Sequence, residues 1–202
     1  MKYDYIIVGA GSAGCVIANR LSEDPSTQVL LIEAGGSDRR FFIQMPIGYG
    51  VTYHQKAVNW MYMTEPSPDA DNKPSYWPRG KVMGGSSSIN AMVYVRGNPR
   101  DFDQWSEAGN PGWSYSDVLP YFKKMESWQN GPDDYRGGDG PLNVSEVSRQ
   151  LHPLCQNFLS AAQEIGIGLN KDMNGATQEG VGNYQITTHK GQRMSSSRAY
   201  LW

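Results

Sequence analysis

The apolar positions at the start of the chain follow a strand–helix–strand order. Residues 3–8 form a β-branched and aromatic run whose last three positions lack polar alternation, which predicts a strand buried on both faces. Apolar residues then recur at helical spacing over 15–21, and Glu23-Asp24-Pro25 ends that helix. Residues 28–32 predict a second strand. The pattern indicates an α/β fold that opens with a Rossmann-like β–α–β unit.

The apolar pattern after this unit is less regular. Residues 41–49 and 58–63 are apolar and aromatic without a clean period, and four prolines lie between residues 66 and 78, which predicts a long loop region. Further patterns predict helices over 100–108, 114–127 and 151–165, and strands over 141–144 and 184–188. Ser114 and Ser116 are alternative N-caps for the second helix; a cap at Ser116 would place Pro120 in the first turn, where proline is tolerated. A last element begins at residue 195.

A glycine-rich turn joins the first strand to its helix. Gly9, Gly11 and Gly14 give G-x-G-x-x-G: the first permits the tight turn, the second a close approach to a diphosphate, and the third close packing of the helix on the strand. The helix N-terminus favours an anion at this place. Glu33 follows the second strand, where a carboxylate bonds ribose hydroxyls and disfavours the 2′-phosphate of NADP.

This constellation predicts a dinucleotide site, and the residues leave NAD and FAD open. The alternative is a plain strand–helix connection with Glu33 as a solvated strand end. The complete order of strand, turn, helix, strand and acid disfavours it.

The charge distribution and the lack of long apolar segments argue against several classes of function. The net charge is −2 and the basic residues are scattered, so no nucleic-acid partner is expected. No apolar stretch approaches the roughly 18 residues of a membrane span, and the first strand begins too early for a signal peptide. The chain is expected to be cytoplasmic; peripheral association with the inner face of the membrane is compatible with this.

Cysteine and histidine usage predicts neither a disulfide nor a metal site. Cys15 and Cys155 have no partner spacing, which fits a reducing compartment, and Cys15 is expected to be a small buried packing residue. His54, His152 and His189 form no metal-ligand pattern. None of the three is predicted to be a catalytic base.

A second glycine-rich turn lies about seventy residues after the first. Gly84-Gly85 precedes three serines, a run that can present backbone N–H groups as a concave nest for an anionic or carbonyl-rich ligand. Asn90 then interrupts an apolar segment and needs hydrogen-bond partners if buried. Taken alone, residues 86–90 also fit a capped helix start.

The second turn and its surroundings strongly resemble the first signature of the glucose–methanol–choline (GMC) oxidoreductases, flavoenzymes that bind FAD. The resemblance covers the whole chain. It is carried by Gly9 to Gly14, Glu33-Ala34-Gly35, Asn59-Trp60, Arg79-Gly80, Gly84 to Asn90, Asp101-Phe102-Asp103, Gly138 to Pro141 and Gln192 to Ser197. Within the family, the chain looks most like bacterial acceptor-linked alcohol dehydrogenases and choline dehydrogenases.

The resemblance implies a set of cofactor contacts along the chain. The ADP half of FAD would be held by the first turn with Ser12, Ala13, Glu33 and Ala34. Trp60, Arg79 and Val82 would lie along the cofactor, and the loop near residues 45–60 would be the lid over FAD. The flavin end would meet Gly85, Ser86, Asn90, Ala91, Met92 and Val93, whose N–H groups would stabilise the reduced flavin.

Two positions depart from the family pattern. Met83 replaces a residue that is usually Leu, Ile, Val or Trp, a volume-conserving change. Ile89 stands where some members carry the histidine that bonds covalently to flavin, so the resemblance implies non-covalent FAD.

The resemblance also implies an activity. A primary alcohol would be oxidised to an aldehyde, with the hydride going to flavin N5 and the electrons to a quinone-type acceptor. An oxidase using O2, a cyanohydrin lyase, a non-catalytic FAD-binding module and an NAD enzyme remain alternatives. Family members are longer, and their His/His or His/Asn base pair would lie beyond Trp202, so this segment alone is expected to be inactive.

The expected domain organisation follows from the same resemblance. Residues 1–145 would form the FAD-binding region, 146–188 the start of a substrate-binding domain, and 189–202 a return to the FAD-binding domain.

Overall fold

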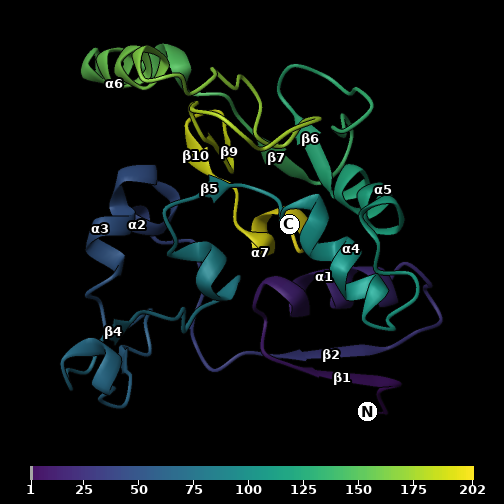
Figure 1. Cartoon of the computed structure of the whole chain (residues 1–202). Helices are drawn as coiled ribbons and strands as arrows, with labels where there is room; N and C mark the ends of the chain where they lie inside the picture. The colour runs from purple at the N-terminus through teal and green to yellow at the C-terminus, as the bar shows by residue number, and fades with distance from the viewer. Residues whose placement is uncertain (1) are drawn as a thin grey trace. The chain divides into compact units, whose positions relative to one another are not determined.

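The computed structural model describes residues 2–202, which form two compact units: residues 2–92 with 188–202, and residues 93–187 (Figure 1). The first unit contains β1 (Tyr5–Val8), α1 (Ser12–Leu21), β2 (Val29–Ile32), α2 (Phe41–Gln44), α3 (Tyr49–Thr52), β3 (Tyr62–Met63), β4 (Tyr76–Trp77), β9 (Thr188–His189), β10 (Gln192–Arg193) and α7 (Ser196–Tyr200), with 3₁₀ turns at Pro46–Gly48, Pro68–Ala70 and Gly85–Ser88. The second contains β5 (Val93–Tyr94), α4 (Pro99–Glu107), α5 (Tyr115–Met125), β6 (Glu126–Trp128), β7 (Leu142–Val144), a 3₁₀ turn at Ser148–Gln150, α6 (Leu154–Glu164) and β8 (Gln185–Ile186).

The division differs from the boundaries expected from the sequence. The second compact unit begins at Val93 rather than at residue 146, because β5 pairs with β8 and thereby joins residues 93–94 to the later segment. The assignment of a substrate-binding role to residues 146–188 stays a prediction.

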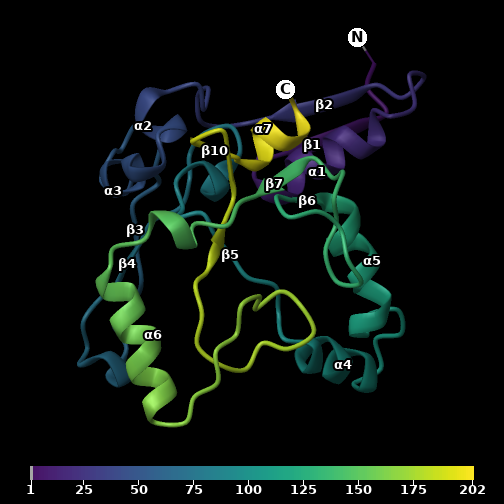
Figure 2. The same ribbon diagram turned by 90° about the horizontal axis from the view of Figure 1, so that it is seen from above.

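The β–α–β unit is present as predicted. β1 and β2 are parallel and in register, with Tyr5 opposite Val29 and Val8 opposite Ile32. α1 buries Gly14, Cys15 and Ala18, and the later helix α7 packs against α1 (Figure 2). The chain therefore returns after residue 188 to complete the core that its first thirty residues begin.

The prediction that the first strand is buried on both faces is wrong. Ile6 is 61% exposed and Val8 84% exposed. Within the described residues β1 and β2 form a sheet of two strands, so no neighbouring strand or second layer of helices covers its far side. An apolar run without alternation is typical of a strand that is packed on both faces of its sheet. The described residues pack against only one face of β1 and β2.

These 202 residues, produced alone, are expected to be poorly stable. Large apolar side chains are exposed in both units, among them Ile6, Val8, Phe41, Ile47, Leu154, Phe158 and Ile165. Such surface favours association and binds hydrophobic dyes. We expect strong fluorescence of added anilinonaphthalene sulfonate and a broad thermal transition. A sharp, cooperative, concentration-independent melt without dye binding would contradict this.

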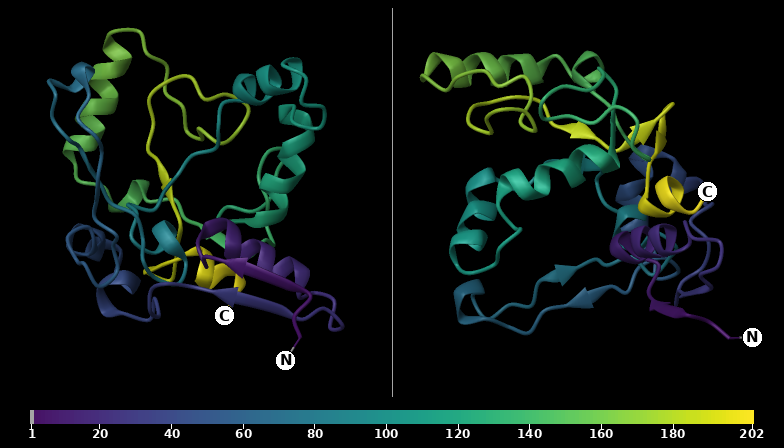
Figure 3. Two further views of the ribbon diagram at one scale, coloured as in Figure 1. Left: turned by 90° about the horizontal axis from the view of Figure 1, so that it is seen from below. Right: turned by 90° about the vertical axis from the view of Figure 1, so that its right-hand side faces the viewer.

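The region between the two glycine turns is more ordered than its sequence pattern indicated. It contains α2, α3 and an antiparallel ribbon in which β3 pairs with β4 (Figure 3, right). Its buried Ile43 and Val58 form one core cluster with Val82 and Ile89, which flank the second glycine pair. These residues come from three separate segments, so no single window of the sequence shows a period. The role of residues 45–60 as a lid stays a prediction.

The predicted helices of the second unit are confirmed, with one choice resolved. Ser114 caps α5 in a capping box with Asp117, so Pro120 lies inside the helix rather than in its first turn. In α6 the expected apolar face is buried only at Leu159 and Ala162.

A buried charge network holds the second unit together. Glu126 and Arg136 are both fully buried, and Arg136 Nε lies 3.0 and 3.1 Å from the two carboxylate oxygens. Arg96 Nη2 donates to Glu126 Oε2 at 2.7 Å, and Arg136 Nη1 donates to both oxygens of Asp172 at 2.8 Å. Nothing in the sequence pattern predicted this network, since the four residues lie far apart along the chain.

Candidate functional site

The two glycine-rich turns lie against each other in the first unit. Gly84 N donates to Ala10 O at 2.7 Å. An alanine Cβ at position 85 would stand 2.7 Å from Gly11 Cα, closer than such atoms come in folded proteins, and Gly85 has a φ of +55°. The absence of a side chain at Gly85 therefore allows the two backbones to touch.

Further glycines serve the same packing. An alanine Cβ at Gly35 would lie 2.0 Å from Lys81 O, and one at Gly80 would lie 2.2 Å from the carbonyl of Gly85. Gly80 N also donates to Ser86 Oγ at 3.0 Å. The segment that follows β2 and the second turn are thus joined main chain to main chain.

A cleft of about 390 Å³ opens where the turns meet. It lies at the carboxyl ends of the parallel strands β1 and β2, the usual ligand position in α/β sheets. It is lined by Val8, Gly9, Gly11, Ile32, Glu33, Ala34, Trp60, Gly80 and Gly85. Six of these were predicted as cofactor contacts: Gly9, Gly11, Glu33, Ala34, Trp60 and Gly85.

The first turn has the geometry that its three glycines predicted. Gly9 has a φ of +98°, which favours glycine. An alanine Cβ at Gly14 would lie 2.0 Å from Gly9 O, so α1 packs directly on the end of β1. At Gly11, by contrast, a Cβ would meet no protein atom within 4 Å. Space is therefore left at Gly11, where a bound diphosphate would need it; the Cβ position of Gly9 is open as well.

The N-terminus of α1 is open to an anion. Gly11 is its N-cap, no side chain caps it, and its first turn holds no acidic residue. Ser12 and Ala13 are exposed in that first turn. Free N–H groups and the positive end of the helix dipole face outward here, which suits a phosphate.

Glu33 braces the same turn. Its Oε2 accepts from Ala10 N and its Oε1 from Gly35 N, both at 2.9 Å. Each carboxylate oxygen keeps lone-pair capacity for a further donor, such as a ribose hydroxyl. The residues present therefore fit the adenosine-diphosphate part of a dinucleotide.

Of the three residues predicted along the middle of the cofactor, one lines the cleft, one lies outside it and one is buried in the core. Trp60 lines the cleft, with Lys81 Nζ 4.5 Å from its ring centroid. Arg79 is exposed, and its guanidinium lies 4.8 Å from the Trp77 ring centroid, outside the cleft lining. The side chain of Val82 is fully buried in the core, so only its backbone could meet a ligand.

The residues predicted at the flavin end form the second turn and its continuation. Ser86 is half-buried in the 3₁₀ turn. Asn90 is exposed and Ala91 partly so, whereas Met92 is buried with a φ of +63°. Val93 is exposed at the start of β5, in the second unit.

Sequence reasoning missed three residues that line the cleft: Val8, Ile32 and Gly80. The rule that ligands bind at the carboxyl ends of parallel strands would have indicated Val8 and Ile32, each the last residue of its strand.

Cys15 is a buried packing residue, as predicted. Its Sγ donates to Ala10 O at 3.2 Å, and burial raises the pKa of the thiol to about 11. In a brief iodoacetamide treatment at pH 8 we expect Cys155 to be alkylated and Cys15 to be spared, because the thiolate is the nucleophile. Equal labelling of the two cysteines in the native protein, read by peptide mass spectrometry, would contradict this.

The raised pKa of Cys15 also makes the stability of the folded protein depend on pH. The folded state holds the thiol proton more tightly than the unfolded state, so the contribution is complete below about pH 9 and is lost as pH rises toward 11.

No group of three or more His, Cys, Asp or Glu side chains within residues 2–202 is placed to hold a metal ion. In the same part of the chain no histidine lines the cleft, and no helix is long and apolar enough to cross a bilayer.

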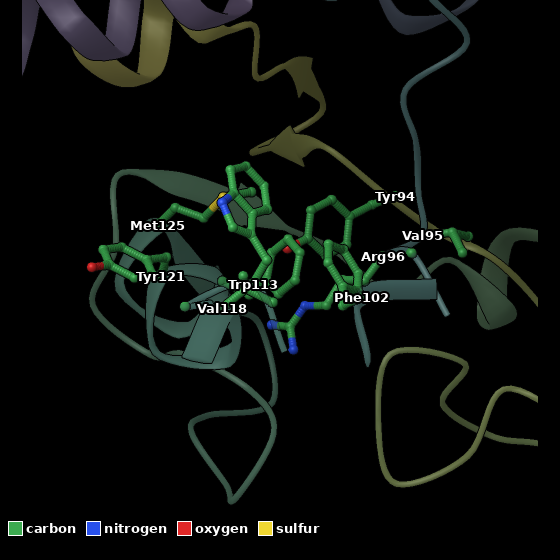
Figure 4. A pocket seen from close by; sticks show the side chains of 11 residues that line it. Tyr94, Val95, Arg96, Phe102, Trp113, Val118, Tyr121 and Met125 are labelled. Carbon is green, nitrogen blue, oxygen red and sulfur yellow. The ribbon is translucent and has the colours of Figure 1, made fainter. Parts of the chain in front are cut away.

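A larger cavity, of about 760 Å³, lies in the second unit (Figure 4). Phe102, Trp113, Tyr121 and Met125 give it an apolar, aromatic lining. Its one charged group is Arg96, which is ion-paired to Glu126. None of the predicted cofactor contacts lines it, so the smaller cleft is the candidate site.

The sequence matches the family model described as GMC oxidoreductase over residues 3–202. The chain belongs to the GMC oxidoreductase family. Among its curated relatives, it is 51% identical over 200 residues to an oxygen-dependent choline dehydrogenase of Photobacterium profundum and 50% identical over 200 residues to an alcohol dehydrogenase [acceptor] of Pseudomonas putida. These alignments cover 98% of this chain but 35% and 36% of the relatives, so the chain spans about a third of their length.

Solved structures show the same GMC fold. Pyridoxine 4-oxidase from Mesorbium loti superposes with a TM-score of 0.94 at 34% identity, over 100% of this chain and 40% of that one. An FAD-dependent oxidoreductase from Chaetomium thermophilum gives 0.89 at 33% identity, over 98% and 36%. The predicted α/β, Rossmann-like FAD-binding fold of the family is confirmed.

Proposed function

We propose that this chain is the FAD-binding part of an oxidoreductase that oxidises a primary alcohol to an aldehyde. The observation that carries the proposal is the contact of two glycine turns around a cleft with an uncapped helix N-terminus and Glu33 at its edge. FAD-dependent and choline- or alcohol-oxidising proteins among the similar chains support it.

The chain's own residues have separate tasks in this proposal. The N–H groups at the start of α1 bind the diphosphate, and Glu33 accepts from the ribose hydroxyls while it holds the backbone at Ala10. Trp60 covers one side of the cleft. Ser86 and the segment from Asn90 onward offer hydrogen-bond donors to the flavin end. FAD, when bound, would supply the group that accepts the hydride.

We further propose that FAD is bound without a covalent link. The side chain of Ile89 has no nucleophilic atom, and it is buried in the core with Val58 and Val82. Denaturation in acid followed by filtration should release all of the flavin. Flavin that stays with the protein would contradict this part of the proposal.

The proton of the alcohol requires a base that this part of the chain does not place in the cleft. His54 stacks on Tyr76, and His152 Nδ1 accepts from the backbone at Leu154. We therefore propose that the base lies outside residues 2–202 and that this segment alone does not turn over.

The direct test is spectroscopic. The enzyme should show flavin absorbance bands that bleach when choline or another primary alcohol is added without oxygen. Bound flavin that never bleaches would favour a non-catalytic FAD-binding module. A folded protein that binds NAD and no flavin would overturn the cofactor assignment.

The electron acceptor is a separate question. We propose a quinone-type acceptor; the Pseudomonas putida relative is named for an unspecified acceptor, whereas the Photobacterium profundum relative is named oxygen-dependent. Reoxidation of the bleached protein by a soluble quinone should exceed reoxidation by air. The opposite order, with peroxide formed, would make the enzyme an oxidase.

A further inference from the structure

Residues 192–197, a motif to which the proposed function gives no task, hold the second glycine turn from within the first unit. Ser196 N donates to Ser87 Oγ at 2.9 Å. Ser195 Oγ and Ser197 Oγ lie 3.2 and 2.5 Å from Asp38 Oδ2, a fully buried carboxylate. The end of the chain thus fixes the backbone that follows Gly84-Gly85.

Arg193 makes the innermost of these contacts. It is 1% exposed, and its guanidinium donates from Nε to Ile43 O at 2.9 Å and from Nη1 to Ser87 O at 3.2 Å. Nη1 also donates to Asn90 Oδ1 at 2.8 Å. No ion pair to a carboxylate is formed by Arg193 among the described residues, and its buried Nη2 has no hydrogen-bond partner there. A full positive charge is therefore buried beside the turn without an anion.

The contact with Arg193 sets the direction of the Asn90 amide. Asn90 Oδ1 accepts both from Arg193 and from Met92 N, at 3.0 Å. The oxygen end of the amide is thereby committed inward, and the NH2 end is left on the exposed side as a donor. An amide flip would place two donors against a guanidinium, so the flipped state is excluded.

We propose that Arg193 is a positioning residue that presents the Asn90 NH2 group to the flavin and places a positive charge one side chain behind it. This rests on the proposed function. A flavin gains negative charge on reduction, and a fixed donor backed by a buried cation stabilises that charge in a low-dielectric site. Arg193 would therefore raise the reduction potential of the bound cofactor.

The experiment compares flavin-loaded wild-type enzyme with Arg193→Met, each equilibrated with a reference dye of known potential. We expect the reduced-to-oxidised ratio to fall at least tenfold, which is about 30 mV for a two-electron couple. Arg193→Lys should recover most of the shift because it keeps the charge. Arg20→Met is the control: this arginine lies in the last turn of α1, where it pairs with Glu23, and the potential of the variant should equal that of wild type.

Asn90 variants show whether the effect runs through that amide, and they keep the test open if Arg193→Met does not fold. Asn90→Asp retains the acceptor for Arg193 but replaces the donor by a carboxylate oxygen, so it should lower the potential at least as much. In a double-mutant cycle, Arg193→Met combined with Asn90→Ala should shift the potential by less than the sum of the two single shifts.

The outcomes separate the inference from the proposed function. A wild-type protein without flavin bands would sink both. A flavin-loaded, alcohol-bleachable wild type whose Asn90→Asp variant has an unchanged potential would overturn the inference alone. An additive effect of the Arg193 and Asn90 substitutions would overturn the claim that Arg193 acts through Asn90.

Discussion

Replacing Gly11 by alanine is expected to abolish FAD binding while the fold survives. Gly11 has an ordinary φ of −77°, and an added Cβ would meet no protein atom within 4 Å. The methyl group would instead occupy the space at the helix N-terminus that the diphosphate needs. We expect the affinity for FAD to fall at least 100-fold, about 2.7 kcal/mol. The melting temperature of the cofactor-free protein should stay within a degree or two of wild type.

Two other glycines make this prediction specific. Gly14→Ala should lose both the cofactor and the fold, because its Cβ would lie 2.0 Å from Gly9 O and would force α1 away from β1. Gly168→Ala, in the second unit, also has an open Cβ position and lies outside the cleft lining, so it should change neither property. FAD titration by tryptophan quenching measures all three. Tight FAD binding by Gly11→Ala would mean that the diphosphate lies elsewhere.

Replacing Glu126 by glutamine is expected to unfold the second unit under mild conditions. The Glu126 carboxylate is fully buried and accepts from Arg96, from Arg136 and from Gly137 N. An amide of the same size would leave two buried guanidinium groups without their shared anion. Breaking a buried ion pair in this way costs about 3–5 kcal/mol.

Urea denaturation followed by tryptophan emission measures this loss. Trp128 is a local reporter because it is buried and Arg136 Cζ lies 4.1 Å from its ring centroid. Asp139→Asn, an acid on the same loop outside the network, is the control and should change stability by no more than about 0.5 kcal/mol. A Glu126→Gln midpoint equal to that of the control would show that the network contributes little.

The same network makes the second unit less stable at low pH. Burial alone would raise the pKa of the Asp172 carboxyl, but hydrogen bonds from Gln185, Arg136 and Asn174 N outweigh it, so the pKa lies below its ordinary value. A lowered carboxyl pKa stabilises the folded state fully above the unfolded pKa of about 4, and the contribution is lost as pH falls through the folded pKa. Asp172→Asn should therefore flatten the decline of stability below pH 4.

The local structure around the first turn was set by the sequence alone. Gly9, Gly11, Gly14 and Glu33 are close together along the chain, and each requirement they meet is local: a positive φ, a close helix and a strand end. The cap of α5 was narrowed to two neighbouring serines, Ser114 and Ser116, of which the structure uses Ser114. Such features need only short-range sterics and hydrogen bonds, which a short window of sequence contains.

Only the tertiary structure decided which distant segments share a site. It brings Gly85 against Gly11, places Arg193 beneath Asn90 and gathers Glu126 and Arg136 into a buried pair. It also buries Val82 in the core and leaves Val8 exposed, against expectation. Burial and charge pairing depend on which other segments cover a residue. The type of a residue does not indicate which distant residue it will contact. The sequence determined the turns and their chemistry; their contact, and the cleft between them, are properties of the folded chain.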